Sequence, residues 1–203
     1  SAFVYCFHHP KIGTWLGASP EQLLKANDDS FETMALAGTQ KDAGEETVIW
    51  QQKEKEEQQF VTDYIVSKLK SVSTEIQVSE AYSVKAGTLW HIKTDISVVF
   101  GQELDLKKAI QLLHPTPAVC GVPKAISKAF IIANENYNRS FYTGYLGELN
   151  RNFASDLFVN LRCMQIENKQ AHLYMGCGIT KDSDPEKEWR ESVNKSMTMK
   201  RIL

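Results

Sequence analysis

One carboxylate falls inside the longest helical stretch of the sequence, residues 44–70. Glu57 precedes Phe60, Val61 and Tyr64 by three, four and seven residues, so the helical repeat places it on the apolar, inward side. A buried carboxylate needs a partner, because an unpaired charge away from water is strongly unfavourable. A metal ion is one such partner. The alternative is that the charged run around Glu57 forms an ordinary solvated helical face.

A second acidic group lies near the end of the sequence. Glu188, Glu191 and Lys195 follow one another at i, i+3 and i+7, which is one stripe of a helix. Two acids and a lysine on one stripe could bind a metal ion and an anion. From spacing alone, a surface ion pair between Glu191 and Lys195 explains the same residues.

Three further positions carry residue types that bind anions or move protons, each with an ordinary alternative. Arg162 lies inside the apolar run 156–166, where it is either a buried anion ligand or an edge-strand residue. Gly176-Cys-Gly178 follows a strand pattern, so a backbone N–H could approach an anion there, although a tight strand exit needs the same glycines. His91 stands in a strand pattern, where a histidine is more often a hydrogen-bonded core residue than a catalyst.

Composition excludes several classes of protein. Lys and Arg number 23 and Asp and Glu 25, which gives a net charge of −2 and no electrostatic case for nucleic acid. No apolar run approaches the roughly 20 residues of a membrane span, and residues 1–10 do not resemble a signal peptide. The four cysteines are too scattered for a zinc site or a disulfide framework, so we expect buried or half-buried free thiols in a cytoplasmic protein.

Strand patterns outnumber helical ones and occur in neighbouring pairs with short turns. Apolar alternation predicts strands at 2–8, 12–17, 30–37, 75–84, 88–100, 141–149, 154–166 and 169–176. Helical spacing predicts helices at 44–70, 104–113, 123–135 and 184–202, and Ser19-Pro-Glu21 has the sequence of another helix start. We therefore expect an α+β fold with antiparallel sheets and outer helices, in one compact unit.

Seven short elements resemble, in order, the motifs of the chorismate-utilising enzymes. They are Ser19-Pro-Glu-Gln-Leu-Leu24, Ala35-Leu-Ala-Gly-Thr39, Leu89-Trp-His91, His114-Pro-Thr-Pro-Ala118 with Gly121 and Pro123, Leu161-Arg-Cys163, Gly176-Cys-Gly-Ile179, and Glu188-Trp-Arg-Glu191 with Lys195. Each motif alone is weak, but the ordered set from residue 19 to 195 is highly specific. One position departs from the family, since many members have Glu-His where this chain has Glu57-Gln58.

The resemblance implies a four-layer α-β-β-α fold of the aminodeoxychorismate synthase type with antiparallel sheets. Residues 1–203 would be the C-terminal portion of a single chorismate-binding domain whose N-terminal part is missing. The resemblance also implies chorismate as the ligand, Mg²⁺ as the cofactor, no nucleic-acid or membrane partner, and a monomer or weak dimer. Carried to matching positions, it implies metal ligands Glu57, Glu188 and Glu191, substrate-binding residues Gly38, Thr39, Arg162, Tyr174, Gly176 and Lys195, and catalytic residues Glu21 and His91.

Within this family the chain most resembles isochorismate synthase, an isomerase that adds water at C2 of chorismate and removes the C4 hydroxyl for menaquinone or siderophore biosynthesis. Glu21 would protonate the departing hydroxyl, so its carboxyl must stay protonated near neutral pH. Leu36 and the Leu-Trp-His run favour the water-using branch over anthranilate and aminodeoxychorismate synthases, and salicylate synthase is a further relative. No residue in 1–20 matches the family's lysine base, so we expect residues 1–203 alone to be inactive. The alternative to an enzyme is a non-catalytic fragment that binds the ligand weakly or not at all.

Overall fold

The computed structural model describes residues 2–27, 30–44, 46–86, 89–99, 106–151, 154–201 and 203. The chain divides into two compact units. Unit 1 comprises residues 1–21, 119–146 and 158–203, and unit 2 comprises residues 22–118 and 147–157. Because the chain passes repeatedly between the units, each unit is built from segments far apart in the sequence. The assignment to a single domain stays a prediction.

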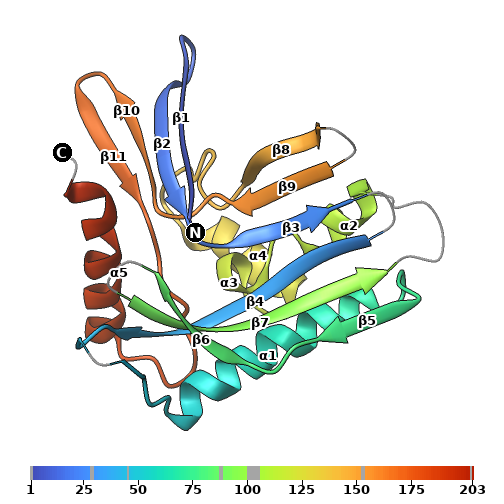
Figure 1. Ribbon diagram of the computed structural model, residues 1–203. Helices are drawn as coiled ribbons and strands as arrows, with labels where there is room; N and C mark the ends of the chain where they lie inside the picture. Colours follow the sequence, from blue (N-terminus) through green and yellow to red (C-terminus); the bar gives the residue numbers. More distant parts are fainter. Residues whose placement is uncertain are drawn as a thin grey trace. The chain divides into compact units, whose positions relative to one another are not determined.

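Unit 2 contains most of a seven-stranded sheet, with α1 (Gln52–Leu69) along one face (Figure 1). The strand order is β5-β7-β4-β3-β9-β8, and β6 also pairs with β7. The strands are β3 (Gln22–Ala26), β4 (Ser30–Lys41), β5 (Glu75–Val78), β6 (Tyr82–Ala86), β7 (Leu89–Val99), β8 (Tyr145–Arg151) and β9 (Ala154–Val159). The β4–β7 pair is antiparallel and is the longest, because it joins residues 30–41 to residues 89–99.

The stripe of α1 that packs inward departs from the predicted one in its first half, whereas Ile65 and Leu69 further along are buried, as the helical spacing predicts. Gln58, Thr62, Ile65 and Leu69 are its buried residues. Phe60, predicted to face inward, is 53% exposed, and Glu57 is half-buried beside the stripe. The helix also begins at Gln52 rather than Gly44, because Gly44 has φ +86° and its N–H is bonded to the Asp42 carboxylate in the preceding loop.

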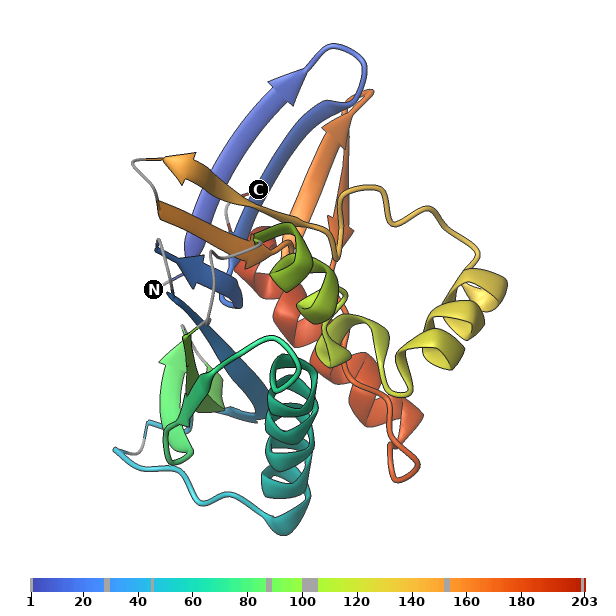
Figure 2. The same cartoon turned by 90° about the vertical axis from the view of Figure 1, so that its right-hand side faces the viewer.

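Unit 1 contains a four-stranded antiparallel sheet of order β1-β2-β10-β11. Figure 2 shows the two hairpins, β1–β2 and β10–β11, side by side. These strands are β1 (Phe3–His9), β2 (Gly13–Ser19), β10 (Cys163–Glu167) and β11 (Gln170–Tyr174). Trp15, Tyr142 and Cys163 form the buried core, with Tyr5 and Tyr174 packed against it.

The remaining helices are α2 (Leu106–Leu113) in unit 2, α4 (Lys124–Asn134) and α5 (Pro185–Lys200) in unit 1, and the single turn α3 (Pro117–Cys120) where the chain passes between the units. Residues 104 and 105 of the predicted helix 104–113 and residue 202 of the predicted helix 184–202 lie outside the described residues. The predicted start of the last helix is confirmed, because Asp184 accepts a hydrogen bond from the Lys187 N–H and Pro185 occupies the first helical position.

The helix predicted to start at Ser19-Pro-Glu21 is wrong, because the strand β3 begins at Gln22. Leu23 and Leu24 are both fully buried, and β3 pairs with β4. The burial of two adjacent leucines and the sheet pairing outweigh the helix-start residues, whose preference is worth only about 1 kcal/mol. Glu21 therefore lies in the connection between β2 and β3 and not at a helix start.

The predicted strand 154–166 is two strands in two different sheets. β9 ends at Val159 and belongs to the seven-stranded sheet, whereas β10 starts at Cys163 and belongs to the four-stranded sheet. Arg162 lies between them with φ +47°, which a strand residue does not adopt. The predicted strand 141–149 likewise starts only at Tyr145, after a turn.

All four cysteines are free thiols, as predicted. Cys120 and Cys163 are buried and Cys177 is half-buried, but Cys6 is exposed on the edge strand β1, contrary to prediction. Burial raises the pKa of the Cys163 thiol to about 12, which keeps it protonated and unreactive at neutral pH. In the described part of the chain, no helix is long and apolar enough to cross a membrane.

Candidate active site

A β-bulge in unit 2 carries two of the predicted site residues, Gly38 and Thr39. The register of β4 against β7 shifts between Ala37 and Thr39, and Gly38 at the bulge has φ +69°. A Cβ at Gly38 would lie 3.1 Å from the Glu54 Cβ and 3.2 Å from Ile92 Cδ1, so the backbone conformation and the space both require glycine. The resemblance motif Ala35–Thr39 is therefore a bulged strand packed closely against α1.

His91 on β7 lies against this bulge. Its Nδ1 is 3.2 Å from the Thr39 hydroxyl and 3.2 Å from the Gly38 carbonyl oxygen, and the ring is almost fully buried. The structure thus brings together Gly38, Thr39 and His91, which the sequence predicted as neighbours only through the family resemblance. These contacts fit both interpretations of His91, because a hydrogen-bonded core histidine and a catalytic histidine each need a fixed ring.

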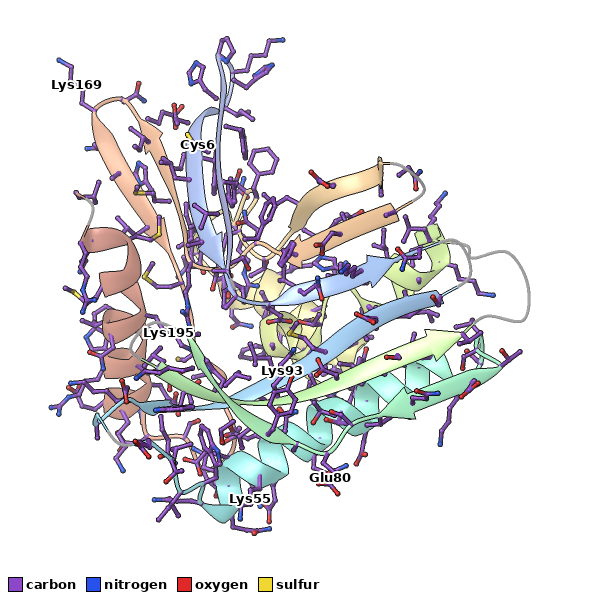
Figure 3. The ribbon with its side chains drawn as sticks, viewed as in Figure 1. Cys6, Lys55, Glu80, Lys93, Lys169 and Lys195 are labelled. Atoms are coloured by element: carbon purple, nitrogen blue, oxygen red, sulfur yellow. The ribbon has the colours of Figure 1, made fainter. Side chains whose placement is uncertain are left out.

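A basic cluster in unit 1 brings together four other predicted residues. The Lys195 ammonium is 2.6 Å from the Glu191 carboxylate and 3.2 Å from the Gly176 carbonyl oxygen, so it joins α5 to the segment after β11 (Figure 3). Burial lowers the pKa of the Arg162 guanidinium, and the nearby negative charge of Glu191 opposes that change. Arg162 and Lys195 are the residue types that bind a carboxylate ligand.

Arg162 has a left-handed backbone conformation and lies in the connection between β9 and β10, outside both strands. Its carbonyl accepts the Ala18 N–H at 3.2 Å, and Asn160, two residues earlier, anchors the crossover from β9 to β10. The Asn160 side chain donates to the Phe141 carbonyl at 2.8 Å and accepts from the Tyr5 hydroxyl at 2.7 Å. Arg162 is therefore not an edge-strand residue but part of a tightly held turn, and its role as an anion ligand stays a prediction.

Sequence reasoning missed Tyr142. This buried phenol lies against Gly176, where a Cβ would be 2.9 Å from the Tyr142 hydroxyl oxygen, and its ring is 5.7 Å from that of Tyr174. Arg139 covers the ring at 5.8 Å and is itself ion-paired to Glu135. The only signal in the sequence was an aromatic-rich run, Phe141–Tyr145, which predicted a strand.

Tyr174 itself lies at the end of β11, stacked on Trp15 with ring centroids 5.3 Å apart. Its hydroxyl is 3.4 Å from the Gln165 side-chain oxygen on β10. Tyr142 is therefore the tyrosine with its hydroxyl against Gly176, and the ligand role of Tyr174 stays a prediction.

Glu21 is buried, with 7% of its surface exposed. Its carbonyl accepts the Val159 N–H at 2.9 Å, and the Ser19 hydroxyl donates to the Val159 carbonyl, so both sides of Pro20 are fixed to the end of β9. This arrangement holds the Glu21 backbone rigidly and removes most water from its carboxyl. A catalytic acid needs both properties.

The three predicted metal ligands fall in different units, with Glu57 in unit 2 and Glu188 and Glu191 in unit 1. Among the described residues no group of three or more His, Cys, Asp or Glu side chains could hold a metal ion. Glu188 and Glu191 are half-buried, one turn apart on α5, and carboxylate oxygens are what Mg²⁺ prefers. Glu57 is 3.9 Å from the Lys53 ammonium, and Glu191 is paired to Lys195. To bind a metal ion, each carboxylate would have to release its lysine or bind the lysine and the metal together.

Unit 2 contains a bulged strand pair, and unit 1 contains a turn and a helix with basic residues. The chain that forms them matches a known family. The family model of the chorismate-binding enzymes matches residues 1–203, and the chain belongs to that family. Its α+β fold with antiparallel sheets is therefore the chorismate-binding fold, as predicted.

Individual relatives share about 30% of the sequence. The chain is 30% identical to the isochorismate synthase EntC of Escherichia coli, covering 98% of this chain and 54% of that protein, and 32% identical to DhbC of Bacillus subtilis, covering 94% and 50%. It superposes on the structure of the menaquinone-specific isochorismate synthase MenF of E. coli with a TM-score of 0.90 and 28% identity, over 98% of this chain and 48% of that one. The chain thus spans about half the length of these relatives.

Proposed function

We propose that this protein is an isochorismate synthase, a cytoplasmic isomerase that converts chorismate to isochorismate in the presence of Mg²⁺. The observation that carries the proposal is the basic cluster of unit 1, where Lys195 binds Glu191 and the Gly176 carbonyl, and where the charge of Glu191 also acts on Arg162. Chorismate carries two carboxylates, so its recognition needs such fixed positive charge. Similarity to three proteins named isochorismate synthases favours this reaction within the family.

In this proposal the residues of unit 1 bind and protonate the substrate. Arg162 and Lys195 bind the enolpyruvyl carboxylate together with the Gly176 N–H, and Tyr142 and Tyr174 form the wall of that subsite. A Mg²⁺ ion held by Glu57, Glu188 and Glu191 would neutralise the ring carboxylate when bound. In unit 2, Gly38, Thr39 and His91 have the substrate-binding and catalytic roles that the resemblance implies.

Glu21 supplies the proton that the reaction needs. Water adds to C2, the two ring double bonds shift, and the C4–O bond breaks. Hydroxide is a poor leaving group, so the Glu21 carboxyl donates its proton and the oxygen departs as water. A base takes the proton of the attacking water; no residue in 1–20 matches the family's lysine base, so residues 1–203 alone should convert little chorismate.

Incubation of the full-length protein with chorismate and Mg²⁺ tests the proposal. We expect isochorismate as the product, by liquid chromatography and NMR, with the same rate whether or not ammonia is added. Formation of an amino-substituted product that depends on ammonia would instead identify an anthranilate or aminodeoxychorismate synthase. Chorismate left unchanged by the full-length protein, under conditions in which it binds, would contradict the proposal and favour a non-catalytic binding role.

A further inference from the structure

Gln58 is the most deeply buried polar residue of α1, with 2% of its surface exposed. Its side-chain oxygen accepts the Ala37 N–H at 2.9 Å, and its side-chain nitrogen donates to the Ala35 carbonyl and to the Thr94 hydroxyl, both at 3.0 Å. One acceptor and two donors of the amide are thereby used. An amide can both accept from a backbone N–H and donate to a backbone carbonyl, as the peptide group of a neighbouring strand does. An ionised carboxylate cannot donate, and a hydrocarbon side chain can do neither.

The two backbone groups that Gln58 binds come directly before the bulge of β4. Ala35 and Ala37 precede Gly38, and the register against β7 shifts immediately after Ala37. Thr94 lies on β7 opposite Ala35. Gln58 therefore ties both strands to α1 at the last regular pair before the bulge, and this fixes where the extra residue is placed.

The backbone after the bulge fixes the His91 ring. The Gly38 carbonyl can only accept a hydrogen bond, so its 3.2 Å contact with Nδ1 favours a proton on that nitrogen, whereas the Thr39 hydroxyl at the same distance can either donate or accept. In the neutral ring the lone pair is then on Nε2. A displacement of Gly38 would release this restriction and allow both tautomers.

We propose that Gln58 is a positioning residue for His91. It holds the Ala35–Ala37 segment, this places the bulge at Gly38, and the Gly38 carbonyl selects the His91 tautomer with Nδ1 protonated. Gln58 does not itself contact His91 by any hydrogen bond described above; it acts through the backbone of β4. The importance of this chain for turnover rests on the proposed function, whereas its effect on the His91 ring does not.

The variant that tests the proposal is Gln58→Met, which keeps an unbranched side chain of similar size and removes the three hydrogen bonds described above. It also removes the longer one of 3.5 Å from the Gln58 side-chain nitrogen to the Thr62 hydroxyl. Gln59→Met is the matched control, because Gln59 is the next residue of α1, is exposed, and bonds only to Asp63 among its described hydrogen bonds. Ring ¹⁵N shifts of His91 in the ligand-free protein report the tautomer, and hydrogen exchange reports the Ala37 N–H. Neither measurement needs chorismate or enzymatic activity.

We expect the wild type and Gln59→Met to show protonated Nδ1 and unprotonated Nε2. In Gln58→Met the two ¹⁵N shifts should move toward each other as the tautomers mix, and Ala37 should exchange at least about tenfold faster. In the full-length enzyme, kcat for chorismate should fall on the order of 10–100-fold with a smaller change in KM, as expected for a misplaced group. Failure of this turnover prediction with the NMR prediction fulfilled would count against the proposed function, not against the positioning.

A folded Gln58→Met protein with unchanged His91 shifts and Ala37 exchange would overturn the proposal. If that variant does not fold, Thr94→Val decides, because it removes only one acceptor of the Gln58 amide and keeps the shape of the side chain. Movement of the His91 shifts in the same direction, by a smaller amount, supports the positioning. Unchanged shifts in Thr94→Val then refute it.

Discussion

The two units hold their site residues by different physical means. In unit 2, Gly38, Thr39 and His91 are fixed by paired strands, a bulge and uncharged hydrogen bonds in a buried environment. In unit 1, Arg162 and Lys195 are placed by a turn and a helix, and charge interactions with Glu191 hold them. In unit 2 the positions of the site residues depend on exact strand register and involve no charge. In unit 1 the site residues supply charge, and their positions depend less on strand register. Substitutions in unit 2 should therefore act through stability and the position of the His91 ring, and those in unit 1 should act through charge and proton transfer.

The largest effect is expected from Glu21, which lies in unit 1 but is held as rigidly as the residues of unit 2. Glu21→Gln keeps the size of the side chain and removes the transferable proton, so kcat in the full-length enzyme should fall roughly 10²–10⁴-fold. Chorismate affinity should change little. Glu80→Gln, at an exposed loop position, is the control (Figure 3). Turnover near that of the wild type would exclude Glu21 as the acid and leave a purely structural role.

A smaller effect is expected from the charge of unit 1. Arg162→Gln removes a partly buried cation, so the dissociation constant for chorismate should rise on the order of 10–100-fold, the usual worth of hydrogen bonds to a charged group. Arg190→Gln removes an exposed arginine of α5 that pairs only with Glu186 among the ion pairs described, and should leave affinity unchanged. Calorimetric titration with chorismate and Mg²⁺ measures both. Equal affinities of the two variants would mean that Arg162 is a structural residue of the turn.

The smallest effect is a loss of stability on replacing glycine by alanine, which should differ between the bulge in unit 2 and the glycine segment after β11 in unit 1. Gly38→Ala forces an alanine to φ +69° against Glu54 and Ile92, which should cost about 1–2 kcal/mol and lower Tm by roughly 2–8 °C. Gly178→Ala meets no atom within 4 Å and should leave Tm within about 1 °C. Thermal unfolding followed by circular dichroism gives both values. A larger loss at Gly178 would reverse the comparison between the two units.

Much of the secondary structure follows from local patterns, and the errors occur where tertiary pairing decides. The hairpin β1–β2, the long β7 and the start of α5 were predictable because alternation and capping residues agree with burial there. Pro20-Glu21 has the residues of a helix start, but the pairing of β3 is a long-range effect that no local pattern contains. The break at Arg162 was equally hidden, since an apolar run does not show that its two halves join different sheets.

The site was predictable in residue type but not in geometry. Helical spacing identified Glu57 as inward-facing, whereas the buried residue is the adjacent Gln58, because the stripe is set by contact with β4 and β7. The family motifs pointed to Ala35–Thr39 and to the α5 stripe, but they did not predict that the first is a bulged strand. Tyr142 could not be found, because its contact with Gly176 joins positions 34 residues apart through the folding of a turn.

The central claim, that this protein adds water to chorismate, is tested most directly by the origin of the new hydroxyl. The full-length protein is incubated with unlabelled chorismate and Mg²⁺ in H₂¹⁸O, and the isochorismate is analysed by mass spectrometry and ¹³C NMR. The account predicts one ¹⁸O atom, bound at C2, because the attacking oxygen comes from solvent and the C4 oxygen departs with the proton of Glu21. Isochorismate without ¹⁸O would mean that the original hydroxyl migrates within the molecule, and would contradict the account.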